Sequence, residues 1–301
     1  LGIPYGLGAG AIDAALNNYV ALHYSSRHMS WLHCFWGVGT IVSPFVMSYA
    51  LTNATWNDGY LIVGILQSAI GVILLVTVPV WKKTGHEAMQ STGQKAIGLF
   101  GALKIKGVPF LLLGFLCYCA AESTAMNWAS TYFVEVKHIS EAQAAQFASL
   151  FYIGMTVGRF LSGFIAGKLG DRRLILLGTC IAAVGIVVLF LPFDVPALAL
   201  AAFIVVGLGC APIYPSIIHS TPFNFGAEHS GAIIGIQMAS AYVGSTFLPP
   251  LFGLLGRHIG FAIMPIWLAV LMALMIVMIE TTFRLTSQKN TIAKDCTQDN
   301  E

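Results

Sequence analysis

Four ionisable side chains lie inside apolar stretches of this sequence: Asp13, His33, Glu122 and Arg159. A charge at the depth of a bilayer is costly, so such groups normally face a partner or a water-filled cavity. A carboxyl group in that position can accept hydrogen bonds from hydroxyl groups, and it can take up and release a proton. We therefore expect the two carboxyl groups, those of Asp13 and Glu122, to serve binding and proton exchange.

Asp13 and Asn17 are four positions apart, so in a helix both side chains lie on one face. Small residues around them let a neighbouring helix approach closely. We predict that Asp13 binds substrate or a cation and that Asn17 lines the same pocket. The alternative for Asp13 is a structural hydrogen bond to a neighbouring helix. His33, near the start of the next apolar stretch, is either a pocket residue or a structural histidine.

Glu122 is a second candidate pocket acid, with a buried structural acid as the alternative. Asn127 follows five positions later, which places it about 140° around an ideal helix. Both residues can face one cavity only if the helix is broken between them, as helices are at many transporter sites. Trp128, Tyr214 and Gln237 are further candidate contacts, with Ser240 and Tyr242 as minor ones, because aromatic and amide groups suit the faces and hydroxyl groups of sugars. Two more ionisable groups, His219 and Glu280, lie near the ends of apolar stretches.

Arg159 lies about two turns from the end of its apolar stretch. A long cationic side chain at that position can extend toward the interface or pair near the gate at that end of the helix. We therefore expect a structural role for Arg159.

The composition places these groups in a membrane protein. Of the 301 residues, 57% are hydrophobic and 9% are charged, whereas soluble domains carry about 25% charged residues. The cations are scattered over loops and form no nucleic-acid-binding surface, and the cysteines show no metal-ligand spacing. The sequence contains no nucleophile, nucleotide-binding or metal motif, so we expect no enzymatic activity, no metal and no cofactor.

Nine stretches are each about the twenty residues that a helix needs to cross a bilayer. They cover residues 1–24, 31–52, 60–81, 108–134, 144–166, 174–193, 195–219, 230–255 and 259–282. Residues 82–107 form a long polar linker, within which 96–103 is a candidate short helix. The polar tail, 284–301, is expected to be unstructured.

The Lys and Arg residues are distributed unevenly over this arrangement. Twelve of the fifteen fall on one side, two on the other, and Arg159 lies within a span. Because cytoplasmic loops carry the excess of Lys and Arg, the linker and the tail are predicted to be cytoplasmic and Leu1 external. A chain that begins in the cytoplasm reaches the outside after an odd number of spans, so we expect an odd number before Leu1.

The turn that follows Gly163 combines glycines with a basic cluster, in the order Gly-Phe-Ile-Ala-Gly-Lys-Leu-Gly-Asp-Arg-Arg-Leu. It resembles the helix–loop–helix signature of the major facilitator superfamily; the alternative is an ordinary positive-inside loop. The signature usually has an acid where this chain has Gly167, which places the usual charge contact of the loop in question. The resemblance gives a gate role to Gly163, Gly167, Lys168, Gly170, Asp171, Arg172 and Arg173.

An internal repeat supports the same family. The stretch 6–13, Gly-Leu-Gly-Ala-Gly-Ala-Ile-Asp, resembles 207–214, Gly-Leu-Gly-Cys-Ala-Pro-Ile-Tyr. A glycine and a proline of the next span also recur at nearly the same offset. Two related six-helix halves would produce such a repeat.

The resemblance implies an all-α integral membrane protein with the major facilitator fold. About nine transmembrane helices are present, helices 4–12 of a 6+6 arrangement. Residues 1–81 would be the last three helices of the N-terminal bundle, 82–107 the linker, 108–283 the six-helix C-terminal bundle, and 284–301 the tail.

Residues 10–18, Gly-Ala-Ile-Asp-Ala-Ala-Leu-Asn-Asn, are similar to the fourth helix of the fucose–proton symporter family and its sodium-glucose-like relatives. The stretches 27–39 and 120–128 resemble the fifth and seventh helices of that family. By this match Asp13 takes the acidic position of the family, and His33 falls where the family has a pocket amide. Glu122 takes the acidic position of the seventh helix.

We therefore expect a secondary active transporter in the cell membrane that moves a sugar or similar small polar solute by alternating access. Asp13 and Glu122 would couple transport to a cation, with the proton favoured. The partners would be the solute, the cation and the lipid bilayer, and no nucleic acid. The alternatives are an exporter of amphipathic compounds and a non-transporting membrane sensor.

Overall fold

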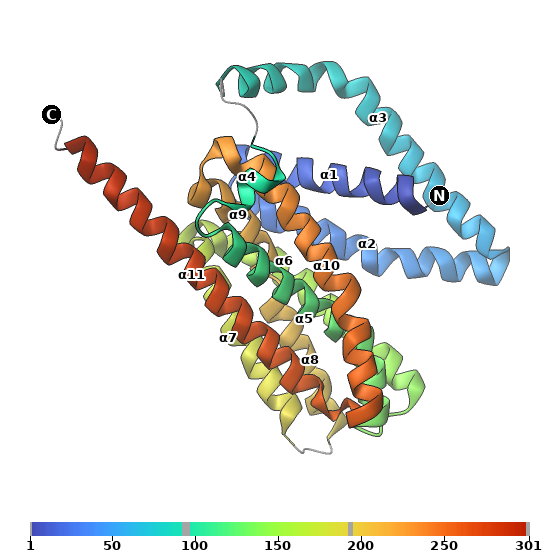
Figure 1. Cartoon of the computed structure of the whole chain (residues 1–301). Helices are drawn as coiled ribbons and strands as arrows, with labels where there is room; N and C mark the ends of the chain where they lie inside the picture. The colour runs from blue at the N-terminus through green and yellow to red at the C-terminus, as the bar shows by residue number, and fades with distance from the viewer. Residues whose placement is uncertain (1, 92–96, 192–194, 299–301) are drawn as a thin grey trace. The chain divides into compact units, whose positions relative to one another are not determined.

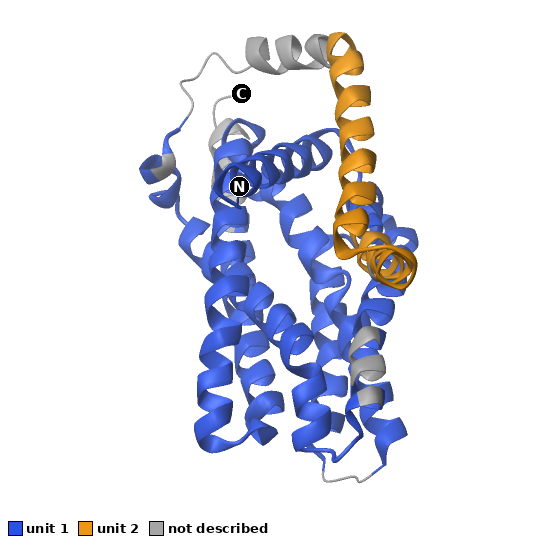
Figure 2. Cartoon of the chain, turned by 90° about the vertical axis from the view of Figure 1, so that its right-hand side faces the viewer, with its two compact units in different colours: residues 1–35, 97–301 blue, residues 36–96 orange. Residues whose placement is uncertain are grey.

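The computed structural model describes residues 2–91, 97–191 and 195–298, and α-helices dominate these residues. They form two compact units: residues 1–35 with 97–301, and residues 36–96 (Figure 2). The helices are α1 (Gly2–His23), α2 (Ser26–Asn53), α3 (Trp56–Ser91), α4 (Leu99–Leu103), α5 (Val108–Glu135), α6 (Glu141–Leu169), α7 (Asp171–Phe190), α8 (Pro196–Cys210), α9 (Ile213–Phe225), α10 (Ala227–Ile259), the 3-10 helix η1 (Phe261–Ile263) and α11 (Met264–Gln298) (Figure 1).

Among the described residues, eight stretches are long and apolar enough to cross a membrane, with α8 and α9 counted as one. The sequence predicted nine. The ninth, α1, is a helix of 22 residues that is not among the eight. It carries Asp13, Asn17 and Asn18, which lower its hydropathy.

The helices of the first unit pack closely against one another. α5 packs against α10 and α11, α8 packs against both α6 and α7, and α1 contacts α9 and α10. Glycines make the closest approaches possible: a Cβ atom on Gly209 of α8 would lie 2.6 Å from the Cα atom of Ala182 on α7. The backbones of these two helices meet there without a side chain between them.

A helix break occurs between α8 and α9 and not within α5. α5 is continuous from Val108 to Glu135, so the condition under which Glu122 and Asn127 could face one cavity is not met. The predicted single span 195–219 is instead divided into α8 and α9 at Ala211 and Pro212. Proline has no N–H group to continue a helical ladder, and the Tyr118 hydroxyl donates a hydrogen bond to the Cys210 carbonyl at 2.8 Å beside the break.

The linker and the tail contain more helix than the sequence predicted. α3 extends to Ser91, well into the predicted linker 82–107. α4 covers Leu99–Leu103, within the candidate short helix 96–103, whose first residue lies outside the described part of the chain. α11 continues to Gln298, where an unstructured tail was expected, because no proline or glycine interrupts residues 284–298.

The second unit contains the larger part of α2 and all of α3 up to Ser91. The turn between these helices is held by Asp58, whose carboxylate accepts hydrogen bonds from the Thr55 backbone N–H at 2.9 Å and the Thr55 hydroxyl at 2.6 Å. These bonds fix the start of α3.

The close contact between α7 and α8 leads to a test of stability. Gly209→Ala should lower the free energy of unfolding by about 1–3 kcal/mol, because the added methyl group forces two backbones apart. Gly235→Ala on α10 is the matched control, since a Cβ atom there meets nothing within 4 Å and alanine favours helix by up to ~1 kcal/mol. Thermal unfolding of the purified protein in detergent measures both. Equal stability of the two variants would show that α7 and α8 do not pack in this way.

Candidate substrate and coupling site

A chain of polar contacts begins on α1 and reaches α2. Asn17 is 1% exposed, and its amide nitrogen donates a hydrogen bond to Asp13 Oδ1 at 2.8 Å. Asn17 Oδ1 lies 3.0 Å from His33 Nε2 and accepts a hydrogen bond from it, because the other end of the amide is the donor. Three of the predicted pocket residues therefore form one connected group.

Residues of α9 and α10 complete this group. The Tyr242 hydroxyl donates a hydrogen bond to Asp13 Oδ2 at 2.8 Å. The Tyr214 ring packs edge-on against His33, with ring centroids 4.8 Å apart, and its hydroxyl lies 3.4 Å from the Met238 sulfur. Asp13 is half-buried, and both of its carboxylate oxygens accept hydrogen bonds. The polar group therefore joins α1 and α2 to α9 and α10.

Arg159 lies beside this group, where the sequence had predicted only a structural role near the helix end. The side chain is 3% exposed, and Nη2 is 3.5 Å from Glu122 Oε1. Nη1 donates a hydrogen bond to the His33 carbonyl at 3.2 Å. The guanidinium group thus connects α6 with α5 and α2, and it does not extend to the interface.

Glu122 has one carboxylate oxygen toward Arg159 and a second one, Oε2, that is buried and has no hydrogen-bond partner among the described residues. A buried acceptor without a partner is costly. Such a group is typical of a site that a ligand, a proton or water completes.

Three other predicted pocket residues lie apart from this group. Asn127 is exposed, because α5 is unbroken and turns it away from Glu122. The Trp128 indole N–H donates a hydrogen bond to the Pro249 carbonyl at 2.9 Å, and the Trp128 ring stacks on Phe261. In this structure Trp128 therefore packs between neighbouring elements. Gln237 is buried and accepts a hydrogen bond from the Thr221 hydroxyl at 3.0 Å.

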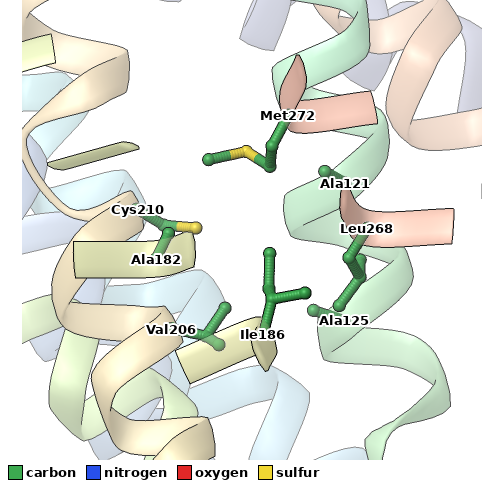
Figure 3. Close-up of a pocket in the computed structure, with 8 residues that line it drawn as sticks. All are labelled: Ala121, Ala125, Ala182, Ile186, Val206, Cys210, Leu268 and Met272. Atoms are coloured by element: carbon green, nitrogen blue, oxygen red, sulfur yellow. The ribbon is translucent and has the colours of Figure 1, made fainter. Parts of the chain in front are cut away.

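Figure 3 shows a cavity elsewhere in the first unit, enclosed by apolar side chains of α5, α7, α8 and α11. Its volume is about 10 Å³, which is about the space of one water molecule. No sugar fits there, so this cavity is a packing defect between helices. Its lining residues are Ala121, Ala125, Ala182, Ile186, Val206, Cys210, Leu268 and Met272.

The glycine-rich turn that follows Gly163 makes specific contacts in spite of the missing acid at Gly167. Gly170 has a positive φ of 74° and precedes the first residue of α7, Asp171. The Ser26 hydroxyl donates a hydrogen bond to Asp171 Oδ1 at 2.6 Å. Arg172 forms an ion pair with Glu280 of α11. Asp171 therefore makes a contact to α2 from a different position of the motif.

Two residues that the structure brings into these contacts, Tyr242 and His219, were not among the main candidates from the sequence. Tyr242 was a minor candidate, and His219 was recognised only as an ionisable group near a helix end. Their partners, Asp13 and Asp171, are more than 40 positions away in the chain. The feature of the sequence that could have identified His219 is the presence of a histidine within an apolar helix.

The model of the Major Facilitator Superfamily matches the sequence twice, over residues 1–217 and 111–295. The chain belongs to the major facilitator superfamily. The second match begins near the start of α5, in agreement with the internal repeat. The predicted family and the predicted all-α membrane fold are confirmed.

Several proteins of known sequence are similar to this chain. The glucose/mannose transporter GlcP of Bacillus subtilis is 22% identical over 255 residues, which cover 82% of this chain and 63% of GlcP. An uncharacterized transporter of Yersinia pestis is 26% identical over 218 residues, 71% of this chain and 54% of that protein. "Bypass of stop codon protein 6" of Saccharomyces cerevisiae is 24% identical over 197 residues, 57% of this chain and 39% of the yeast protein. The chain thus spans less than two thirds of each relative.

Solved structures of the superfamily share the fold. The E. coli fucose:proton symporter FucP superposes with a TM-score of 0.70 at 16% identity, covering 91% of this chain and 74% of FucP. A bacterial homologue of the iron transporter ferroportin, in an outward-facing state, gives a TM-score of 0.65 at 13% identity, covering 94% and 70%. At these identities the likeness establishes the fold.

The ion pair between Glu122 and Arg159 predicts a coupled effect of two substitutions. Glu122→Gln removes the negative charge that lies 3.5 Å from the buried guanidinium, so it should destabilise the protein by about 3–5 kcal/mol. Replacing Arg159 with Gln as well should recover much of this loss. Glu135→Gln is the control, because Glu135 lies exposed at the end of the same helix and should change little. Thermal unfolding measures the cycle; purely additive effects would argue against the pair.

Proposed function

We propose that this protein is a secondary active transporter that moves a sugar or similar small polar solute together with a proton. The observation that carries the proposal is the polar group of Asp13, Asn17, His33 and Tyr242, which joins α1 and α2 to the helices of the C-terminal half. A solute bound among these side chains would contact both proposed six-helix bundles. Alternating access requires such a shared site, because the two bundles move around it.

The chemistry of the side chains supports a polyhydroxylated solute. Carboxylate and amide groups of Asp13 and Asn17 can exchange hydrogen bonds with hydroxyl groups, and the ring of Tyr214 offers an apolar face of the kind that packs against a sugar ring. The names of two relatives are consistent with this class, since GlcP is a glucose/mannose transporter and FucP a fucose:proton symporter. Asn127, Trp128 and Gln237 are not needed for this minimal site.

The arrangement around Asp13 supports proton coupling. In its ionised form Asp13 accepts hydrogen bonds from Asn17 and Tyr242. In its protonated form the carboxyl group can donate a hydrogen bond to a solute hydroxyl. Protonation would thereby change what the site can bind, which is the requirement for coupling. Glu122 is the second proposed coupling carboxylate, since protonation would remove the negative charge from a buried carboxylate whose Oε2 atom has no hydrogen-bond partner among the described residues.

The orientation in the membrane is part of the same proposal. The end of the helices that carries Lys168, Arg172 and Arg173, here called the basic end, would face the cytoplasm. In the described structure the basic ends of α1 and α2 contact those of the C-terminal half through Ser26 and Asp171. The site would then be closed toward the cytoplasm in this conformation.

Asp13→Asn tests the coupling role, because the amide cannot exchange a proton. In the native protein reconstituted in liposomes, counterflow exchange of the transported sugar should survive, since exchange needs no net proton movement. Accumulation driven by an imposed pH gradient should fall to background. The matched control is Asp58→Asn in the second unit, where Asp58 only holds the turn before α3. Accumulation by Asp13→Asn equal to that of Asp58→Asn would exclude Asp13 as the coupling site, and ligand binding without any flux would favour a sensor.

A further inference from the structure

We propose that His219 and Asp171 form a second proton-binding site, separate from Asp13, that holds the basic end closed when it is protonated. The residues of this basic-end gate are Tyr24, Ser26, Asp171 and His219. The inference rests on the proposed function, because it assigns to the gate a step of a proton-coupled cycle. Beyond the proposed substrate site, it identifies His219 as a residue on which the opening of the gate depends.

His219 lies between two hydrogen-bond acceptors. Its Nδ1 atom is 2.6 Å from Asp171 Oδ2, and its Nε2 atom is 3.2 Å from the carbonyl oxygen of Tyr24. The other carboxylate oxygen of Asp171 accepts the hydrogen bond from Ser26. The His219 side chain is 8% exposed, so water does not readily replace a lost partner.

The number of protons on this pair decides how many of these contacts can form. A carbonyl oxygen can only accept, so Nε2 of His219 must carry a proton to bond Tyr24. The contact with Asp171 then needs a second proton, either on Nδ1 or on the carboxyl group. Both arrangements hold the same two protons. When one proton leaves, one of the two hydrogen bonds of His219 is lost whichever tautomer remains.

The contacts of His219 cross the boundary that must open. Tyr24 lies in the turn that follows α1, and Ser26 is the first residue of α2, whereas Asp171 and His219 belong to α7 and α9. Separation of the proposed bundles at the basic end therefore breaks the bonds of His219 to Tyr24 and of Ser26 to Asp171. The neighbouring bonds from Trp31 to the Phe160 carbonyl and from Ser230 to Asn18 do not depend on a titrating group.

The other charged groups at this end are engaged elsewhere or exposed. On the elements packed against α9, Asp171 is the charged group in contact with the His219 ring. Glu228 lies 3.8 Å from His229, and Glu280 pairs with both Arg172 and Arg284. Further titratable groups near this end are exposed: His23 of α1, Arg27 and His28 of α2, Lys168 of α6 and Arg173 of α7.

The direction of the pH effect follows from linkage. In the closed gate both hydrogen bonds of His219 form only when the His219–Asp171 pair holds two protons. The closed gate therefore binds the second proton more tightly than the open gate does. Low pH therefore favours the closed gate, and rising pH favours opening, by up to about tenfold in the ratio of open to closed per pH unit for one proton. Imidazole groups titrate in the physiological range. In a symporter this would open the cytoplasmic side where the proton is released.

Distances between spin labels across the gate test this proposal. The labels are carried by cysteines at the exposed positions Arg27 and Arg173. They are introduced into a full-length protein in which all other cysteines, including the six in this sequence, are replaced by alanine. Pulsed electron paramagnetic resonance from pH 5.5 to 8, without any sugar, should show a long-distance population that grows as pH rises. In His219→Gln the population should no longer depend on pH. The control His229→Gln, which lies outside the gate, should respond like the parent protein.

Two results would overturn the proposal: a parent protein whose distances do not change with pH, or a His219→Gln variant that keeps the pH response of the parent. If His219→Gln does not fold, Asp171→Asn serves in its place and should weaken the response to pH. Since the measurement needs no substrate, it is independent of the proposed transport activity. A pH-dependent gate in a protein that moves no sugar would leave the gate assignment standing and reject the function.

Discussion

A guanidinium group at the depth of a bilayer needs a counter-charge inside the protein, and Arg159 finds it in Glu122. This single requirement has consequences for the helices around it. Arg159 also bonds the His33 carbonyl, so α5, α6 and the start of α2 meet at one point. His33 in turn reaches Asp13 through Asn17. The pairing of one buried cation thus organises the polar centre of the first unit. Each polar side chain there is positioned by its bond to the next residue in this series of contacts.

The membrane fold was predictable from the sequence because long apolar stretches have few structural solutions. In a bilayer the backbone must satisfy its own hydrogen bonds, so such stretches become helices. Asp13 and Asn17 were also predictable as one group, since a spacing of four residues places them on one helix face. The site of the helix break could not be predicted from the sequence, because a helix can be interrupted at any of several glycines and prolines. Tyr118, which bonds the carbonyl of Cys210 at the break, is 92 positions away in the chain.

Contacts between distant helices account for the remaining differences between expectation and structure. Arg159 was expected either to extend toward the interface or to pair near the gate, and the position of Glu122 on another helix decides its conformation. The loop motif lacks an acid at Gly167, yet Asp171, four positions later, contacts Ser26 and His219. Trp128 was a candidate sugar contact by its residue type, and in the structure its indole N–H donates a hydrogen bond to the Pro249 carbonyl, a contact that the sequence does not reveal. Such pairings depend on tertiary structure, which a helical pattern does not specify.

The central claim is that a sugar and a proton enter together. The most direct measurement is the external pH of a lightly buffered suspension of de-energised cells that express the native protein, followed after addition of glucose, mannose, fucose or a related sugar. The account predicts that a transported sugar makes the medium more alkaline, and that a proton ionophore abolishes the change. Uptake of the sugar without alkalinisation, or with acidification, would contradict proton symport.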